Sequence, residues 1–361
     1  MAKRVFNFNP GPSTLPLDVL KIVQEELLDY KGTGMSIMES SHRAAEFIEI
    51  NDTAISLARE IFGLDEKYHV MFLTGGASTQ FFQIPMNFLA GGKTGAYADT
   101  GTWSNKAIKE ANIVGKAHVA FDGKAIGYKH IPNQNELNIP SDAAYLHITT
   151  NNTIKGTQYH YTPNTGKIPL IADMSSDIAC RRLDYTKFTM FYAGSQKNLG
   201  PAGTTLVCMH DDLLQKSSDA IPTILNYKTQ AAEKSLYNTP PCFAIYVVKL
   251  VFEWIKKQGG LAGIEKNNIA KKNAIYGMMD KYPDYFKGTA EKESRSWMNL
   301  TMRLPSEDLE KKFIAESKAA GFIGLKGHRS VGGVRVSLYN AMSLEGAEKL
   351  VQFMEDFKKK N

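Results

Sequence analysis

The sequence predicts an α/β protein with a large domain built on a mostly parallel sheet and a smaller α+β domain at the C-terminal end. The length of 361 residues is enough for about two domains. Between residues 68 and 209, short apolar runs alternate with stretches of helical periodicity. The apolar runs are almost unbroken, which is typical of strands that are covered on both faces.

The elements are expected in a definite order. Turn-forming residues at 9–13 precede two helices, at about 18–30 and 44–62, and Gly63 stands in the C-cap position of the second helix. The alternating part is then expected as strand 68–73, helix 80–89, strand 96–98, helix 103–114 and strands 144–149, 169–174, 190–193 and 204–209.

The pattern changes near the glycine pair Gly259-Gly260. Residues 242–255 before it form the most apolar stretch, which is too short and too charged to span a membrane and is expected to be a buried helix. After the pair we expect helix 261–279, strand 297–302, helix 306–320, strand 334–338 and helix 343–357. We therefore expect one domain over residues 1–257 and a second over 258–361, with about 15 N-terminal residues packed on the second.

The composition is that of an ordinary soluble globular protein. The net charge of +6 is too mild to indicate a nucleic-acid partner and is compatible with a small anionic substrate. The three cysteines include no CxxC pair, so we expect neither disulfides nor a metal site, and a reducing compartment is favoured. With no signal peptide or membrane span, we expect a cytoplasmic protein without a membrane partner.

Common phosphate-binding fingerprints fail in this chain. Residues 32–37 begin like a GxGxxG motif, but they end in Ile37 and follow no strand. Residues 92–94 resemble the end of a P-loop, but Asn87 stands where the first glycine is required. HExxH and GxSxG motifs are also absent from the sequence.

Three other segments together suit one cofactor. Lys197 follows the apolar strand 190–193, where partial desolvation favours a Schiff-base-forming lysine, although a surface lysine in a turn is the commoner case. Asp173 ends a strand and can hold a protonated ring nitrogen, or it forms an Asx turn. Residues 74–80 offer backbone N–H groups to an anion at a helix N-terminus. These are the groups that pyridoxal phosphate requires, and Trp103 is placed either to stack on its ring or to pack in the core.

Short segments spread along the chain carry a resemblance to a known family. They are FNPGP at 8–12, SSHR at 40–43, GGAS at 75–78, DTG at 99–101 with WS at 103–104, NTI at 152–154 with Gly156, ADMSS at 172–176, QKN at 196–198, NTPP at 238–241 and GHRSVGG at 327–333 with Arg335. On these segments the chain resembles the phosphoserine aminotransferases, which are fold-type I pyridoxal phosphate enzymes of the class V aminotransferase group. The last segment is the most specific of the set.

The resemblance implies a role for each site residue. Lys197 forms the Schiff base with the cofactor, and Asp173 pairs with the pyridine nitrogen. Further cofactor contacts are implied for Gly76, Ala77 and Ser78 at the phosphate, Trp103 on the ring, Thr153 near the ring hydroxyl, Gln196 beside the lysine, and Asn238 and Thr239 from the second subunit of a homodimer. Substrate contacts are implied for Arg43 at a carboxylate and for His42, His328, Arg329 and Arg335 around the phosphate and carboxylates. Some family members carry a basic residue where this chain has Ser78, so the contribution of that loop to substrate binding stays open.

The implied reaction is the reversible transamination of 3-phosphooxypyruvate with L-glutamate to O-phospho-L-serine and 2-oxoglutarate, a step of serine biosynthesis. The family also uses the analogous phosphohydroxythreonine reaction of pyridoxine biosynthesis. The alternatives are a cysteine desulfurase, an alanine–glyoxylate type transaminase and a non-catalytic anion-binding protein. A desulfurase commonly needs a reactive cysteine late in the chain, but no cysteine follows Cys242, and a non-catalytic protein is expected to lack Lys197 or Asp173.

Overall fold

The computed structural model describes residues 4–361. Its strands are β1 Phe6–Asn7, β2 Tyr68–Thr74, β3 Thr94–Asp99, β4 Lys116–Asp122, β5 Leu146–Thr149, β6 Asn151–Asn152, β7 Thr157–Gln158, β8 Leu170–Asp173, β9 Met190–Gly194, β10 Thr204–His210, β11 Lys287–Gly288, β12 Asn299–Arg303, β13 Phe322–Ile323 and β14 Val334–Ser337. Its α-helices are α1 Leu17–Glu25, α2 Ala45–Phe62, α3 Gly76–Phe88, α4 Thr102–Val114, α5 Asp211–Leu214, α6 Tyr227–Ala232, α7 Cys242–Lys257, α8 Gly260–Lys281, α9 Glu307–Ala319 and α10 Leu344–Lys360.

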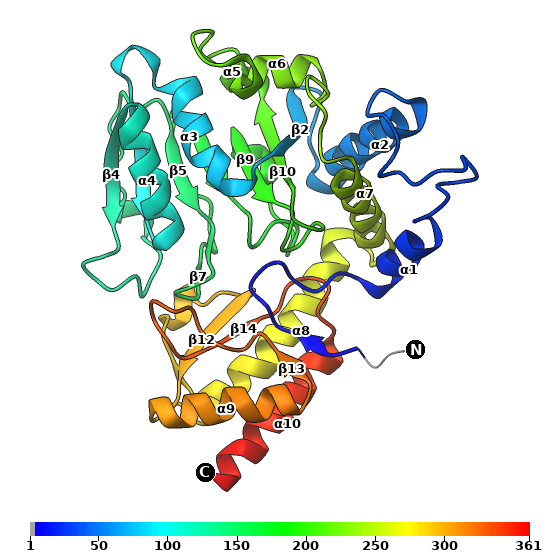
Figure 1. The fold of residues 1–361 in the computed structure, drawn as a ribbon. Helices are drawn as coiled ribbons and strands as arrows, with labels where there is room; N and C mark the ends of the chain where they lie inside the picture. Colours follow the sequence, from blue (N-terminus) through cyan, green and yellow to red (C-terminus); the bar gives the residue numbers. More distant parts are fainter. Residues whose placement is uncertain (1–3) are drawn as a thin grey trace.

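The main sheet has seven strands in the order β2-β10-β9-β8-β5-β3-β4 (Figure 1). Strand β10 is antiparallel to both of its neighbours, whereas the strands from β9 to β4 are parallel to one another. The predicted α/β architecture with a mostly parallel sheet is therefore confirmed. The carboxyl ends of β5, β8 and β9 meet at one edge, which is where ligands of such sheets bind.

Both faces of the sheet are covered, which explains the unbroken apolar strands. In β9, Met190 and Tyr192 pack with α3 and α4 on one face. Phe191 and Ala193 alternate with them and pack with α2 and α7 on the opposite face. Because successive side chains of a strand point to opposite faces, a strand with two covered faces needs an apolar residue at every position.

The structure differs from the predicted elements in several places. The helix expected at 80–89 begins at Gly76, and the short elements α5, α6, β11 and β13 were not expected. The first helix ends at Glu25, not near residue 30, because Glu26 accepts a hydrogen bond from the hydroxyl of Tyr246 on α7 and the ring of Tyr30 packs edge-on against the same tyrosine. Strand β4 was not expected. It is the edge strand of the sheet and is partly exposed, so charged and polar residues (Lys116, His118 and Asp122) interrupt and flank its short apolar run at 119–121.

A second core lies among the elements that follow α7. Its residues come from α8, β12, α9, β14 and α10, and they include Ile275, Leu300, Phe313, Val336 and Leu350. These elements gather in the lower half of Figure 1, coloured yellow to red. The turn between α7 and α8 uses Gly259 and Gly260, both at positive φ, where glycine carries no steric penalty. The separate core supports our proposal that the chain divides at residues 257 and 258.

The N-terminal segment lies against this second core. Strand β1 pairs in parallel with β13, and the ring of Phe8 is fully buried in the second core. Among residues 4–361, no helix is long and apolar enough to cross a membrane. The same residues contain no group of three or more His, Cys, Asp or Glu side chains placed to hold a metal ion.

Candidate active site

A cavity of about 320 Å³ lies at the carboxyl ends of the parallel strands, between the main sheet and the second core. Most of the predicted site residues line it: Gly76, Ala77, Ser78, Trp103, Thr153, Asp173, Gln196, Lys197, His328 and Arg335. The cavity therefore unites residues that are as far apart in the sequence as Pro10 and Arg335.

Lys197 enters this cavity from a tight turn after β9. The backbone N–H groups of Leu199 and Gly200 both donate to the carbonyl of Ser195, at 3.1 and 2.8 Å, and these bonds fix the backbone around the lysine. Its side chain lines the cavity and is largely enclosed, with only partial exposure to solvent. This burial lowers the pKa of the Lys197 amine, and the nearby charge of Asp173 opposes the shift. The environment therefore favours a neutral, nucleophilic amine.

Asp173 is the last residue of β8, and only 4% of it is exposed. One carboxylate oxygen accepts a hydrogen bond of 2.9 Å from the backbone N–H of Ser175. Burial raises the pKa of the Asp173 carboxyl, while hydrogen bonding to Ser175 and the charge of Lys197 act in the opposite direction. A buried carboxylate of this kind gains stability when a cationic N–H group lies against it.

Trp103 and Thr153 are joined to each other and to the second core. The indole Nε1 of Trp103 donates to Thr153 Oγ1 at 3.0 Å, and the Thr153 carbonyl accepts a hydrogen bond of 3.1 Å from Arg335 Nη1. The Nζ of Lys197 lies 5.7 Å from the centroid of the Trp103 ring. The indole is therefore held close to the lysine, where a flat ligand attached to the amine can lie against it.

The N-terminus of α3 forms an anion cradle in the same cavity. Gly75 and Gly76 have φ values of 99° and 70°, and a Cβ on Gly75 would lie 1.8 Å from Thr79 Oγ1, so only glycine fits there. No side chain caps this helix. Its first backbone N–H groups, at Gly76, Ala77 and Ser78, have no partners within the helix and are free to bind an anion.

Arg335 and His328 reach the cavity from the small α+β part. Arg335 is 6% exposed, and its Nε is buried without a hydrogen-bond partner among the described residues. Burial and the charges of Arg335 and Arg329 lower the pKa of His328. A buried guanidinium with an unused donor is well suited to bind a carboxylate or phosphate.

Five predicted residues do not line this cavity in their own chain: His42, Arg43, Asn238, Thr239 and Arg329. Arg43, Thr239 and Arg329 are exposed. The Nε2 atom of His42 is buried without a partner in the part of the chain that the structure describes, and Asn238 lines a separate small pocket beside Thr74 and Thr79. Their predicted roles stay predictions.

Gly75, from the expected anion-binding segment 74–80, also lines the cavity. Other residues line it although no role was expected for them. They are Pro10, Gly11, Thr149, Asn151, Ile154, Ser175 and Ser176. Gly11 is the most informative of them, since a Cβ there would lie 3.2 Å from Cγ of Lys197. Its segment, FNPGP, stands out in the sequence, but nothing in the sequence says that it reaches the lysine.

Comparisons with known proteins agree with this geometry. The family model described as aminotransferase class-V matches residues 5–350. A phosphoserine aminotransferase of Herpetosiphon aurantiacus is 51% identical over 353 residues, which are 98% of this chain and 98% of the relative. The chain belongs to the phosphoserine aminotransferase family of class V aminotransferases.

Solved structures of phosphoserine aminotransferases superpose closely on this chain. The enzyme from Bacillus circulans subsp. alkalophilus gives a TM-score of 0.97 at 49% identity, with 99% of each chain covered. A PLP-bound phosphoserine aminotransferase from Trichomonas vaginalis gives a TM-score of 0.92 at 33% identity, with 98% of this chain and 100% of that chain covered. The resemblance seen in the sequence and the fold-type I architecture are thus confirmed.

Proposed function

We propose that this chain is a pyridoxal phosphate-dependent aminotransferase that moves an amino group reversibly between L-glutamate and 3-phosphooxypyruvate, giving 2-oxoglutarate and O-phospho-L-serine. The observation that carries the proposal is the union of Lys197, Asp173 and the N–H cradle at Gly76 in one cavity. The choice of substrates rests on relatives that are about half identical over the whole chain. Because O-phospho-L-serine is a phosphorylated form of serine, the proposed reaction is a step of serine biosynthesis.

The residues of the cavity fit pyridoxal phosphate. Its phosphate suits the cradle of Gly76, Ala77 and Ser78, its ring suits the face of Trp103, and a protonated ring nitrogen suits the buried carboxylate of Asp173. When bound, the cofactor supplies an aldehyde that condenses with amines and a ring that accepts the electron pair left when the substrate α-carbon loses its proton. Asp173 stabilises the positive ring nitrogen on which that electron sink depends.

Lys197 has two proposed tasks. Its amine, whose pKa is lowered by burial, holds the cofactor between turnovers. Once displaced by the incoming amino acid, the same amine takes the proton from the substrate α-carbon as a general base and returns a proton as a general acid. The turn at Ser195 keeps the amine close to the cavity throughout.

The substrate anions are assigned to the small α+β part and to a second chain. Arg335 and His328 line the cavity and supply donors for a carboxylate or phosphate. We also propose a homodimer, in which Asn238 and Thr239 of one chain complete the phosphate cradle of the other. His42 and Arg43 lie outside the cavity of their own chain, so we assign them to the second chain's cavity as well.

An assay of amino transfer from L-glutamate tests this function. We expect rapid formation of O-phospho-L-serine from 3-phosphooxypyruvate, and at least tenfold slower use of hydroxypyruvate, because losing a charge-assisted contact costs about 1.5–3 kcal/mol. Alanine with glyoxylate, and phosphohydroxythreonine as amino donor, belong in the same assay. Equal rates with hydroxypyruvate, or a preference for alanine and glyoxylate, would exclude the proposed substrate pair.

A further inference from the structure

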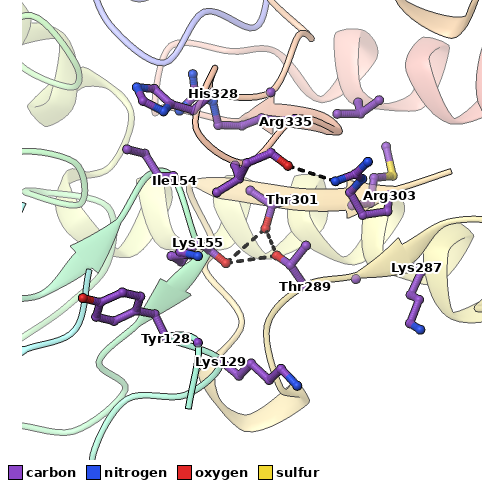
Figure 2. Close-up of a pocket in the computed structure, with 17 residues that line it drawn as sticks. Tyr128, Lys129, Ile154, Lys155, Lys287, Thr289, Thr301, Arg303, His328 and Arg335 are labelled. Carbon is purple, nitrogen blue, oxygen red and sulfur yellow. Dashed lines mark hydrogen bonds between the residues drawn. The ribbon is translucent and has the colours of Figure 1, made fainter. Parts of the chain in front are cut away.

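A second cavity, of about 380 Å³, lies beside the catalytic one (Figure 2). The loop at Tyr128 and Lys129 and the turn at Ile154 and Lys155 border it on the side of the main sheet. Strands β11 and β12 and the loop that leads into β14 border it on the side of the second core. Ile154, His328 and Arg335 line both cavities, so these residues form the wall between them.

The lining of this second cavity carries charge of one sign. Its basic side chains are Lys129, Lys155, Lys287, Arg303, His328 and Arg335, and no described residue of the lining is Asp or Glu. Only Arg303 has a carboxylate partner, Glu310, at 2.5 Å. No carboxylate of residues 4–361 lies within 4.0 Å of the amines of Lys129, Lys155 or Lys287. A concave surface lined by one sign of charge concentrates counter-ions.

Hydrogen bonds to two backbone carbonyls hold the floor of the second cavity in place. The hydroxyl oxygens of Thr289 and Thr301 each lie 3.1 Å from the carbonyl oxygen of Lys155 and within hydrogen-bond distance of each other, so the three oxygens form one shared hydrogen-bond cluster (Figure 2). The carbonyl of Lys129 accepts a hydrogen bond of 2.9 Å from the backbone N–H of Glu291. The backbones of Lys129 and Lys155 are therefore fixed against the second core, and both residues line the same cavity as Lys287.

We propose that this cavity is a second anion site, which binds the phosphate group of inorganic phosphate or of a small phosphate monoester with Lys129, Lys155 and Lys287. Lysine ammonium groups bind phosphate as point charges, and three of them balance a dianion with charge to spare. The volume of about 380 Å³ admits a phosphate that carries a few carbon atoms. The site performs no chemistry, so the proposal stands apart from the proposed function.

Equilibrium binding of inorganic phosphate to the holoenzyme at constant ionic strength tests the site. The variant Lys129→Gln/Lys287→Gln removes two exposed charges from the cavity, and neither residue lines the catalytic cavity. The matched control Lys124→Gln/Lys292→Gln removes two exposed charges that stand five positions away in sequence and line neither cavity. Cofactor absorbance and the basal transamination rate serve as checks that both variants are intact.

We expect the wild type and the control to bind one more phosphate per chain than Lys129→Gln/Lys287→Gln, or to bind it about tenfold more tightly. The same titration with O-phospho-L-serine distinguishes free phosphate from a phosphate monoester as the ligand. If Lys129→Gln/Lys287→Gln binds both probes less well, the site takes phosphate groups in general. If it loses binding of one probe only, that probe represents the ligand of the site. Equal binding by the two double variants with both probes would overturn the proposal. An equal loss in the control would also overturn it, since the effect would then belong to net charge and not to this cavity.

Discussion

The hydroxyl of Ser13 donates a hydrogen bond of 2.5 Å to the backbone carbonyl of Lys197. The backbone N–H of Ser13 donates to the carbonyl of Gln196 at 3.0 Å, so two neighbouring peptide groups at the lysine are held by one residue. The chain before Ser13 is bound to the second core, since the hydroxyl of Tyr339 donates to the carbonyl of Pro10 at 2.8 Å and β1 pairs with β13. The N-terminal segment thus ties the lysine turn to the small α+β part.

We predict that Ser13→Ala lowers the catalytic rate several-fold and speeds loss of the cofactor, because a net hydrogen bond is worth about 1 kcal/mol. The KM for glutamate should stay close to that of the wild type, since Ser13 does not line the cavity. Cofactor dissociation and the separate values of kcat and KM measure the effect. Ser13→Thr keeps the hydroxyl and should restore both values; if it behaves like Ser13→Ala, the hydrogen bond is not responsible.

Asp173→Asn should keep the fold and the cofactor but lose most of the rate. An amide cannot stabilise a positive ring nitrogen as a carboxylate does, and removal of a comparable electrostatic group costs about 3–4 kcal/mol of barrier, or roughly a hundredfold to a thousandfold in rate. Turnover and the cofactor content of the purified variant are the measurements. A variant that turns over within threefold of the wild type would exclude this role for Asp173.

The same substitution has a predicted pH signature. Burial lowers the pKa of Lys197, whereas the negative charge of Asp173 raises it. Removing that charge leaves the ammonium form less stable, so the pKa of Lys197 should fall further. The rate at which the apoenzyme takes up pyridoxal phosphate should therefore reach its plateau at a lower pH in Asp173→Asn. A shift to higher pH would contradict the assigned electrostatic interaction between the two groups.

Arg335→Leu should raise the KM for O-phospho-L-serine far more than the KM for glutamate. Loss of a charge-assisted contact is worth about 1.5–3 kcal/mol, or roughly tenfold to a hundredfold in the specificity constant. The quantity to measure is the ratio of the two specificity constants in the variant and in the wild type. Arg182→Leu, which removes an exposed arginine paired with Glu265, is the matched control. An unchanged ratio would exclude a phosphate contact for Arg335, and if both specificity constants also stay at the wild-type values, Arg335 is a structural residue.

Gly156 connects the main sheet to the second core, so Gly156→Ala should destabilise the protein. Its φ is 75°, and a Cβ there would lie 2.4 Å from Thr301 Oγ1. Gly166 has a φ of 60° with nothing within 4 Å of a Cβ, so Gly166→Ala has only the backbone strain. We expect Gly156→Ala to lower the free energy of unfolding by about 1–3 kcal/mol more than Gly166→Ala. Equal decreases in the free energy of unfolding of the two variants would show that the Thr301 side chain moves aside without destabilising the protein.

Much of the fold was accessible from the sequence because its signals are local. Strand β9 is apolar at every position because both of its faces are covered. Gly259 marks the break before a new helix, because its φ of 87° is a conformation that favours glycine. The end of α1 was not predictable, because contacts of Glu26 and Tyr30 with Tyr246, far along the chain, determine it. Strand β4 gives a weaker signal because it lies at the sheet edge, where polar residues such as Lys116 and His118 are tolerated beside its short apolar run.

Some residues of the candidate site were likewise predictable from local sequence, and others were not. Asp173 ends one apolar strand and Lys197 follows another, and such strand ends are where α/β sheets place their ligands. Gly11 and Ser13 gave no local signal, because they reach the lysine only through the pairing of β1 with β13. Arg335 could be assigned only through the resemblance, since nothing within β14 says that the strand faces the cavity.

Borohydride reduction of the holoenzyme, followed by peptide mapping, tests most directly whether Lys197 is the lysine that carries the cofactor. Reduction converts the bond between cofactor and amine into a stable one, so the labelled lysine can be identified by mass. We predict that the label lies on Lys197 alone, and that Lys197→Ala takes up no label while still binding pyridoxal phosphate in the separate cradle at Gly76. A label on any other lysine, or an equally labelled Lys197→Ala, would contradict the account.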